Sequence, residues 1–224
     1  MTAVTTDAPL ACLFIPDMRT EWSGWLAFGI VWVLTLAPGF ALLWAYKMRP
    51  GEADGAPDVW PVGTRIARNR DRATLVLFAH PQCPCTRASL AELARLMARF
   101  EGRLGANVVF LRPLDVGGDW DSSDLWRRAS TIPGVTVVRD DDGVEAARFH
   151  ASTSGATVLY DVQGRLLFSG GITSARGHEG DSAGLQRISS LLRTGKADRS
   201  DAPVYGCSMR HEARPALAIQ KETP

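Results

Sequence analysis

The chain has 224 residues, of which 46% are hydrophobic, and its formal net charge is +1. This length allows one ordinary domain with appended segments, and the balanced charge argues against a nucleic-acid or strongly acidic partner. The four cysteines are too few and too unevenly spaced to hold a small domain together by disulfides; they are Cys12, Cys83, Cys85 and Cys207.

An uncharged apolar run at 25–46 follows a polar N-terminal segment at 1–24. The run is long enough for the roughly 20 residues that a helix needs to cross the hydrocarbon core. Aromatic residues near both ends suit the two membrane interfaces, and Pro38 would kink the helix without forbidding it. A buried core helix and a cleaved signal peptide are the alternatives, but the apolar part of a signal peptide spans only about 7–15 residues. We therefore expect one retained transmembrane helix in contact with the lipid bilayer.

Residues 47–73 are rich in proline and glycine and end in a basic stretch. The arginines of that stretch could contact lipid headgroups. A solvated linker is the simpler interpretation, and we favour it.

A domain is expected over 74–195. The short apolar run at 74–80 predicts a buried strand. Apolar residues at helical spacing then predict a helix from Pro84 to Leu104 with one buried stripe, stopped by Gly105. A second strand is expected at 107–113.

The rest of the domain alternates between helical and extended patterns. The expected elements are a helix at 121–130 capped by Asp121 or Ser122, a strand at 135–140, helical turns at 142–150, a hairpin of strands at 156–161 and 165–170, and a helix through 185–192 that ends at Gly195. This order predicts an α/β domain in which helices cover a mixed sheet. Residues 196–224 are expected to form a loose tail that contains Cys207.

The cysteine pair lies between the first strand and the first helix of this domain, in the sequence HPQCPCTRASL at 80–90. Proline is favoured at the first helical position, so Pro84 places Cys83 at the helix cap. The Cys83 sulfur then lies near unpaired backbone N–H groups at the positive end of the helix dipole, which favours thiolate over thiol. Cys83 is therefore the expected nucleophile, and Arg87 in the first turn could add positive charge.

Cys85 is the expected partner of Cys83. Two residues apart at a helix start, their Cα atoms should lie about 5–6 Å apart, within the usual disulfide range. The ring of such a disulfide is small, and strain makes a disulfide easier to reduce. A purely structural bridge would close almost no loop and would stabilise little. We therefore favour redox or metal chemistry over a structural role.

Three stretches of the sequence resemble a known group of proteins. The strand, the cysteine pair at a helix start and the later ATVLYDVQGRLLFSGG are similar to the thioredoxin-like superfamily. More narrowly, FAHPQCPCTRASLAEL, GGITSARGHEGD and PVYGCSM resemble the membrane-anchored bacterial RedB-like proteins. The resemblance implies a thioredoxin-like α/β/α sandwich with a mixed central sheet, covering about residues 60–195.

The chain departs from the usual pattern of that superfamily at two places. The common motif is Cys-x-x-Cys, and here one spacer residue is missing. Thioredoxins have a cis-proline just before the first hairpin strand, facing the cysteines, and Gly155 takes that place here. The peroxiredoxin arrangement, with a threonine two residues before a single cysteine, does not occur, because Thr86 follows both cysteines.

Several further residues could form the wall of the site. His80 could tune Cys83 or join a metal site, or it could simply be a polar residue at a strand end. The Gly-rich loop at 170–181 brings Arg176, His178 and Glu179, and a polar loop held by a strand can line a site. The alternative is a solvated loop that caps the last helix through Asp181 or Ser182.

Cys207 lies in PVYGCSM, an apolar, turn-rich island within the polar tail. Such a patch gains from docking on the domain. We predict that Cys207 lies near Cys83 and Cys85, close to the 170–181 loop, as a third redox thiol or a soft metal ligand. The alternative is a tail cysteine with no role.

Three functions compete. The leading one is a thiol–disulfide oxidoreductase without a cofactor, which acts on protein thiols and disulfides. The second is a copper-delivery module, because two thiolates with further ligands suit Cu(I); those ligands would come from His80, His178 and Cys207. The third is a non-catalytic subunit of a membrane complex.

The location of the domain is predicted by two opposing signals. Lys47 and Arg49 follow the apolar run and only Arg19 precedes it nearby, which favours a cytoplasmic domain. Redox chemistry and the family resemblance favour the extracytoplasmic side, where disulfides persist, and long domains can cross regardless of flanking charge. We expect a single-pass membrane protein with its domain outside the cytoplasm.

Overall fold

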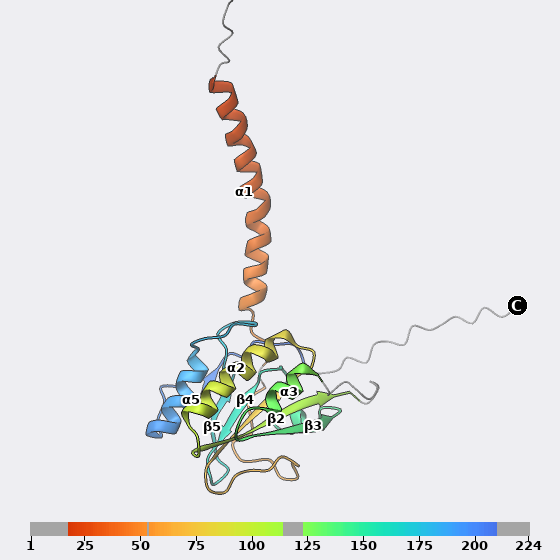
Figure 1. Cartoon of the computed structure of the whole chain (residues 1–224), viewed down its shortest axis with the longest axis vertical. Helices are drawn as coiled ribbons and strands as arrows, with labels where there is room; N and C mark the ends of the chain where they lie inside the picture. Colours follow the sequence, from red (N-terminus) through yellow and green to blue (C-terminus); the bar gives the residue numbers. More distant parts are fainter. Residues whose placement is uncertain (1–17, 53, 114–122, 210–224) are drawn as a thin grey trace, which may run out of the picture. The chain divides into compact units, whose positions relative to one another are not determined.

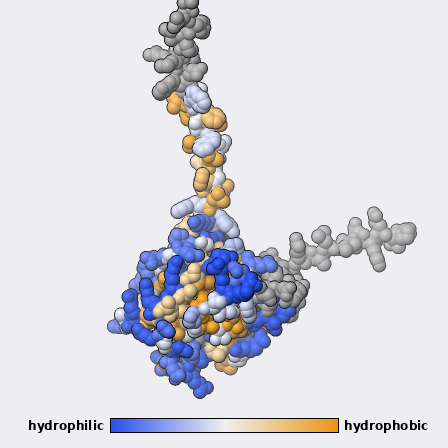
Figure 2. Space-filling view, in the orientation of Figure 1, coloured by the Kyte–Doolittle hydropathy of each residue, from blue (hydrophilic) through white to orange (hydrophobic). Residues whose placement is uncertain are grey.

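The computed structural model describes residues 18–52, 54–113 and 123–209, and the chain divides into two compact units at Tyr46 and Lys47. The first unit is built on helix α1 (Met18–Met48). Within it, Gly24–Met48 is long and apolar enough to cross a membrane, and none of its most apolar stretch is buried. Figure 2 shows mostly orange and pale colours along this helix, whereas the visible face of the domain is blue around an orange and pale centre. The predicted apolar helix is therefore confirmed.

The second unit contains a six-stranded mixed sheet in the order β3-β2-β1-β4-β5-β6 (Figure 1). Strand β1 pairs with β2 in parallel and with β4 antiparallel, and β4 forms an antiparallel pair with β5. The strands are β1 (Ala73–Ala79), β2 (Leu104–Arg112), β3 (Val135–Asp141), β4 (Thr157–Tyr160), β5 (Leu166–Gly170) and β6 (Asp201–Ala202). A parallel βαβ unit beside an antiparallel hairpin is the arrangement of the thioredoxin-like fold, so the predicted fold class is confirmed.

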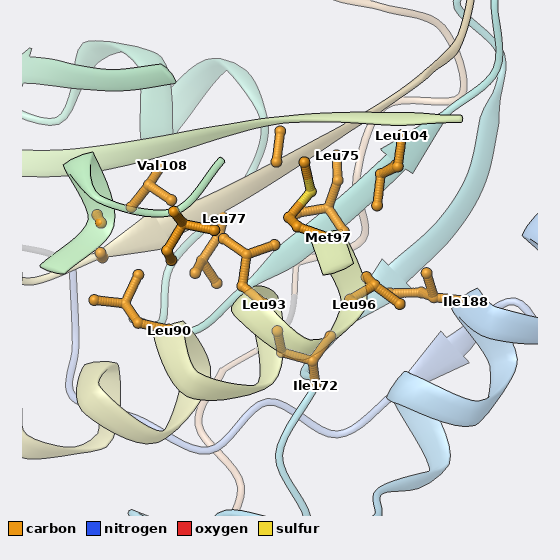
Figure 3. Close-up of a cluster of buried hydrophobic side chains, with 14 of the residues drawn as sticks. Leu75, Leu77, Leu90, Leu93, Leu96, Met97, Leu104, Val108, Ile172 and Ile188 are labelled. Atoms are coloured by element: carbon orange, nitrogen blue, oxygen red, sulfur yellow. The ribbon is translucent and has the colours of Figure 1, made fainter. Parts of the chain in front are cut away.

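Helices cover both faces of the sheet. Helices α2 (Pro84–Arg99), α3 (Asp124–Ser130) and α5 (Ala183–Thr194) contribute to one hydrophobic cluster, and the short α4 (Val144–Arg148) contributes to the other. Strand β1 alternates between them: Leu75 and Leu77 belong to the first cluster, while Val76 and Phe78 belong to the second. Figure 3 shows Leu93 of α2 directed toward Leu77 of the sheet. This alternation explains why β1 is buried along nearly its whole length.

Two helix ends differ from the sequence prediction. Helix α2 ends at Arg99, and Gly102 (φ +72°) makes the turn into β2, so Gly105 is a strand residue and not the helix stop. The cause is tertiary, because Leu104 already pairs with Ala73 in the sheet. Helix α3 is capped by Ser123, whose hydroxyl accepts from the Trp126 N–H. The predicted caps Asp121 and Ser122 lie outside the described residues.

The other predicted caps are confirmed. Ser182 caps α5 by accepting from the Leu185 N–H, and Gly195 ends that helix at φ +72°. Positive φ is the conformation for which glycine is favoured at a helix end.

Both segments expected to be loose pack on the domain. In the predicted linker, Ile66 is buried and the Trp60 ring lies 5.1 Å from the Tyr160 ring. In the predicted tail, β6 extends the sheet and both Val204 and Met209 are buried. Each segment carries enough apolar surface to offset the entropy of ordering it. The expectation of a loose segment is therefore wrong for this part of 47–73 and for β6, whereas the predicted docking of the apolar island around Cys207 is confirmed.

Candidate functional site

The site is built at the start of α2. Cys83 is the N-cap residue, with extended backbone angles (φ −85°, ψ 119°), and Pro84 occupies the first helical position. The Cys83 N–H donates to the His80 carbonyl at 3.1 Å, and the Cys83 carbonyl accepts from the Thr86 N–H at 3.0 Å. The predicted placement of Cys83 is confirmed, and its sulfur lies at the positive end of the helix.

A buried polar cluster holds this turn against the segment before β4. The Ser154 hydroxyl accepts from the His80 N–H at 2.9 Å and lies 3.0 Å from the Thr86 hydroxyl, which donates to the His80 carbonyl at 3.1 Å. Both hydroxyls are buried, so each depends on these partners. The roles of Thr86 and Ser154 could not be predicted from the sequence, because an isolated serine or threonine carries no signal of its tertiary partners.

The same segment holds the tail in place through backbone pairing. The Ser154 N–H donates to the Cys207 carbonyl and the Met209 N–H donates to the Ser152 carbonyl, both at 2.8 Å, around an antiparallel bridge between Thr153 and Ser208. Cys207 is thus fixed by main-chain hydrogen bonds, like a residue of a short strand.

These contacts bring the sulfurs of two distant cysteines together. The Cys83 and Cys207 sulfurs lie 3.0 Å apart and share a hydrogen bond. Cys83, Cys85 and Cys207 are all free thiols in this structure. The residue Cys83 is 1% exposed and Cys85 9% exposed, whereas Cys207 is partly exposed. The predicted proximity of Cys207 to Cys83 is confirmed by this distance.

Neighbouring groups make Cys83 the most acidic of the three thiols. A hydrogen bond from the Cys85 thiol, helped by the thiol and backbone N–H of Cys207, lowers the pKa of Cys83 to about 4 against the opposing effect of burial. The pKa of Cys85 is raised, chiefly because it donates to Cys83. Burial, followed by the hydrogen bond to Cys83, raises the pKa of Cys207 to about 11. The arrangement thus favours one thiolate between two protonated thiols.

Arg176 and Gly206 hold the tail against this site. The Arg176 guanidinium donates to the Gly206 carbonyl, and its charge favours the thiolate forms of Cys85 and Cys207. A Cβ added at Gly206 would lie 1.8 Å from the Ser154 carbonyl oxygen. The close approach of tail and loop therefore requires glycine at this position.

Gly155 faces α2 and the tail. Its N–H donates to the Phe78 carbonyl at 2.7 Å, and its φ is +93°. An added Cβ would lie 3.3 Å from the Ser89 hydroxyl and 3.6 Å from the Tyr205 carbonyl oxygen. No peptide bond in the described residues is cis. Gly155, at the position where thioredoxins have a cis-proline, therefore has trans peptide bonds, and the docked tail lies beside it.

Two of the predicted wall residues point elsewhere. Arg87 forms an ion pair with Asp124 of α3 at 3.2 Å, so its charge is neutralised there and not directed at Cys83. Glu179 is exposed and lies 3.6 Å from Arg95, well along α2 from the cysteines. The expectation that these two residues serve the sulfur site is not supported by their contacts.

The two histidines differ in their surroundings. His178 is exposed, and its backbone N–H donates to the Ala175 carbonyl. The Nδ1 atom of His80 accepts from the Gln82 N–H at 3.2 Å, which places this side chain over the turn before Cys83. Among the residues that the structure describes, no group of three or more His, Cys, Asp or Glu side chains is arranged to hold a metal ion.

Comparison with known proteins finds relatives in fold alone. No family model matches the sequence, and no curated protein matches it. An uncharacterised conserved protein from Geobacillus kaustophilus is similar in structure, with a TM-score of 0.53 and 16% identity over 75% of this chain and 94% of that one. A hypothetical protein from Sinorhizobium meliloti gives a TM-score of 0.57 and 16% identity over 75% of this chain and 100% of that one. At such identities the likeness shows the shared fold and nothing of the activity.

Proposed function

We propose that this chain is a membrane-anchored thiol–disulfide oxidoreductase that acts on protein thiols and disulfides. Cys83 is the attacking group, and Cys85 completes a Cys-Pro-Cys redox pair. The observation that carries the proposal is the position of the Cys83 sulfur, at the start of α2 and among thiol and backbone donors. Stabilising a thiolate in this way produces the nucleophile that disulfide exchange requires.

The reaction follows from these positions. The Cys83 thiolate attacks one sulfur of a partner's disulfide, forms a mixed disulfide, and releases the partner's other sulfur as a thiolate. Cys85 then loses its proton and attacks the Cys83 sulfur, and the partner's second sulfur leaves and is protonated. The partner's disulfide is reduced to two thiols, and the two protein thiols are oxidised to one disulfide. The reverse sequence oxidises a partner dithiol.

Copper delivery, the second candidate from the sequence, has weaker support. Thiolates are suitable ligands for Cu(I), and Cys207 lies beside Cys83. The predicted ligand His178 is exposed, however, and no group of three or more His, Cys, Asp or Glu side chains in the described residues is arranged to hold a metal ion. Titration of the reduced chain with Cu(I) tests this candidate independently of disulfide exchange.

The decisive experiment compares two serine variants of the full chain in detergent. The readout is reduction of a disulfide-bonded protein such as insulin, with dithiothreitol as the electron source. We expect Cys83→Ser to lower the rate on the order of 100-fold or more, because the attacking group is gone. Cys12→Ser, which removes a thiol outside the described residues, is the control and should keep the full rate. Full activity of Cys83→Ser would rule the proposal out.

The proposal places the domain on the extracytoplasmic side, anchored by the apolar helix. The length and composition of Gly24–Met48 support the anchor, and the side is supported by the persistence of disulfide chemistry outside the cytoplasm. A reporter enzyme that is active only outside the cytoplasm, fused to the C-terminus, should be active. A cytoplasm-specific reporter that is active at the same position would contradict this orientation.

A further inference from the structure

We propose that Cys207 is a third redox thiol, which forms a disulfide with Cys83 and passes the oxidising equivalent from the buried cysteine pair to a partner dithiol. The inference rests on the proposed function, because it uses the same Cys83 thiolate. It adds a second disulfide state, with the docked tail supplying the second sulfur.

The position of the Cys207 sulfur favours a disulfide with Cys83. The Cys83 and Cys207 sulfurs are 3.0 Å apart, and a disulfide bond needs about 2 Å. The backbone on both sides is fixed: Cys207 by the Ser154 N–H, and Cys83 as the cap of α2. Small side-chain rotations are therefore enough to bring the two sulfurs to bonding distance.

The tail that carries Cys207 is held tightly on the domain. Two main-chain hydrogen bonds link 207–209 to 152–154, a third links the Gly51 N–H to the Val204 carbonyl, and Arg176 binds the Gly206 carbonyl. Val204 and Met209 are buried on either side of the cysteine. A cysteine held at this position has a high effective concentration toward Cys83.

Cys83 and Cys207 differ in how easily a partner can reach their sulfurs. Cys83 is 1% exposed, whereas Cys207 is partly exposed at the surface of the site. An incoming thiolate can therefore reach the Cys207 sulfur of a Cys83–Cys207 disulfide more easily than the Cys83 sulfur. Attack there releases Cys83, and the thiol of Cys85 can still donate to the departing Cys83 thiolate, which favours this leaving group.

The exchange balances in two stages. First, Cys207 loses its proton to solvent and attacks the Cys83 sulfur of the Cys83–Cys85 disulfide, and Cys85 leaves and takes up a proton. Second, one thiolate of the partner dithiol attacks the Cys207 sulfur and Cys83 leaves as a thiolate. The partner's second thiolate then attacks the partner's first sulfur in the mixed disulfide with Cys207, and Cys207 leaves and is protonated. The partner loses two electrons, and the cysteines of this chain regain two.

The experiment maps disulfides in the full chain carrying Cys12→Ser. The protein is oxidised with oxidised glutathione, its remaining thiols are blocked, and it is cleaved with trypsin. Cleavage after arginine leaves Cys83 and Cys85 together in peptide 73–87 and Cys207 in peptide 200–210. In the additional variant Cys85→Ser, we expect these two peptides to be linked in most molecules. In the matched variant Cys83→Ser, the link should be at least about tenfold rarer, because Cys207 is held beside Cys83.

The outcomes separate the two proposals. If the linked peptides are missing from both the Cys12→Ser chain and its Cys85→Ser derivative, while insulin reduction still requires Cys83, the role of Cys207 is overturned and the proposed function stands. If insulin reduction does not require Cys83, the proposed function fails first. Equal linkage in the Cys83→Ser and Cys85→Ser variants would also overturn the inference, because Cys207 would then show no preference for Cys83.

Discussion

Two segments are expected from the sequence to line the site, the loop at 170–181 and the tail at 203–209. They differ in how close they bring a side chain to Cys83, and their composition does not predict which one comes closer. The loop is the more polar and charged of the two, yet its His178 and Glu179 are exposed, and Glu179 pairs with Arg95. The tail carries little charge, and it brings a sulfur to 3.0 Å from Cys83. The comparison teaches that a functional position depends on how firmly its backbone is held near the reactive group, and less on how many polar side chains a segment carries.

The loop has its own structural role. The Glu92 carboxylate of α2 is buried and accepts from the Gly180 N–H and from Arg95, both at 2.6 Å. These contacts hold the far end of the loop on α2, while Arg176 near its middle contacts the tail. The loop thus supports the tail that supplies the third sulfur.

The largest expected effect comes from Gly206→Ala. The added methyl group would meet the Ser154 carbonyl oxygen at 1.8 Å, so the tail must move. We expect a loss of about 1–3 kcal/mol in the free energy of unfolding and a fall on the order of tenfold in the yield of the Cys83–Cys207 disulfide, since the sulfurs no longer meet. Chemical denaturation and the peptide mapping described above measure the two effects.

The matched control is Gly177→Ala. An added Cβ there meets nothing within 4 Å, although its φ of +65° strains alanine. We expect the free energy of unfolding to fall by only about 1 kcal/mol and the disulfide yield to stay as in the parent chain. If the yield of the Cys83–Cys207 disulfide is the same in the Gly206→Ala and Gly177→Ala variants, the close approach of the tail to Ser154 does not position Cys207.

A smaller effect is expected from Arg176→Ala, with His178→Ala as its counterpart in the same loop. Losing Arg176 removes the hydrogen bond to Gly206 and a positive charge that favours the Cys207 thiolate. The pKa of Cys207 should therefore rise further, and alkylation of Cys207 at pH 8 should slow by about 3–10-fold. His178→Ala should change that rate by less than about twofold, since the side chain is exposed. Equal slowing of Cys207 alkylation in both variants would contradict the claim that Arg176, and not His178, acts on the Cys207 thiol.

The smallest effect is expected from Glu179→Gln. Its ion pair with Arg95 joins two half-exposed side chains at 3.6 Å. Such pairs contribute about 0–1 kcal/mol, so neither the unfolding midpoint nor insulin reduction should change appreciably. A large loss of activity in this variant would show that the charged end of the loop belongs to the site after all.

Local chemistry in the sequence predicts much of this structure. The Cys83 cap, Pro84 at the first helical turn, the hairpin and the α5 caps depend on neighbouring residues, so periodicity and turn chemistry are enough to place them. The approach of Cys207 was predictable from a short apolar island in a polar tail.

The features that could not be predicted from the sequence are contacts between residues that lie far apart along the chain. Arg87 turns to Asp124, and Thr86 meets Ser154, through contacts between elements that no local pattern specifies. The packing of Trp60 and the early end of α2 are likewise set by the sheet and the second hydrophobic cluster. In each case tertiary packing overrides a reasonable local expectation.

The sign of the pH dependence follows from the shifted pKa values. Because the pKa of Cys83 is lowered to about 4, the thiolate stabilises the folded chain above the ordinary thiol value, and that contribution is lost as pH falls toward 4. The raised pKa values of Cys85 and Cys207 keep those thiols protonated across the neutral range.

The most direct test of the central claim is the rate at which iodoacetamide alkylates each cysteine of the reduced chain between pH 6 and 8. The rates are measured by mass spectrometry. Cys83 is already a thiolate in this range, so its rate should stay nearly flat, while the rates of Cys85 and Cys207 should rise about tenfold per pH unit. The account is contradicted if the Cys83 rate also climbs about tenfold per unit toward an ordinary thiol pKa of about 8.5, or if Cys85 shows the flat profile in its place.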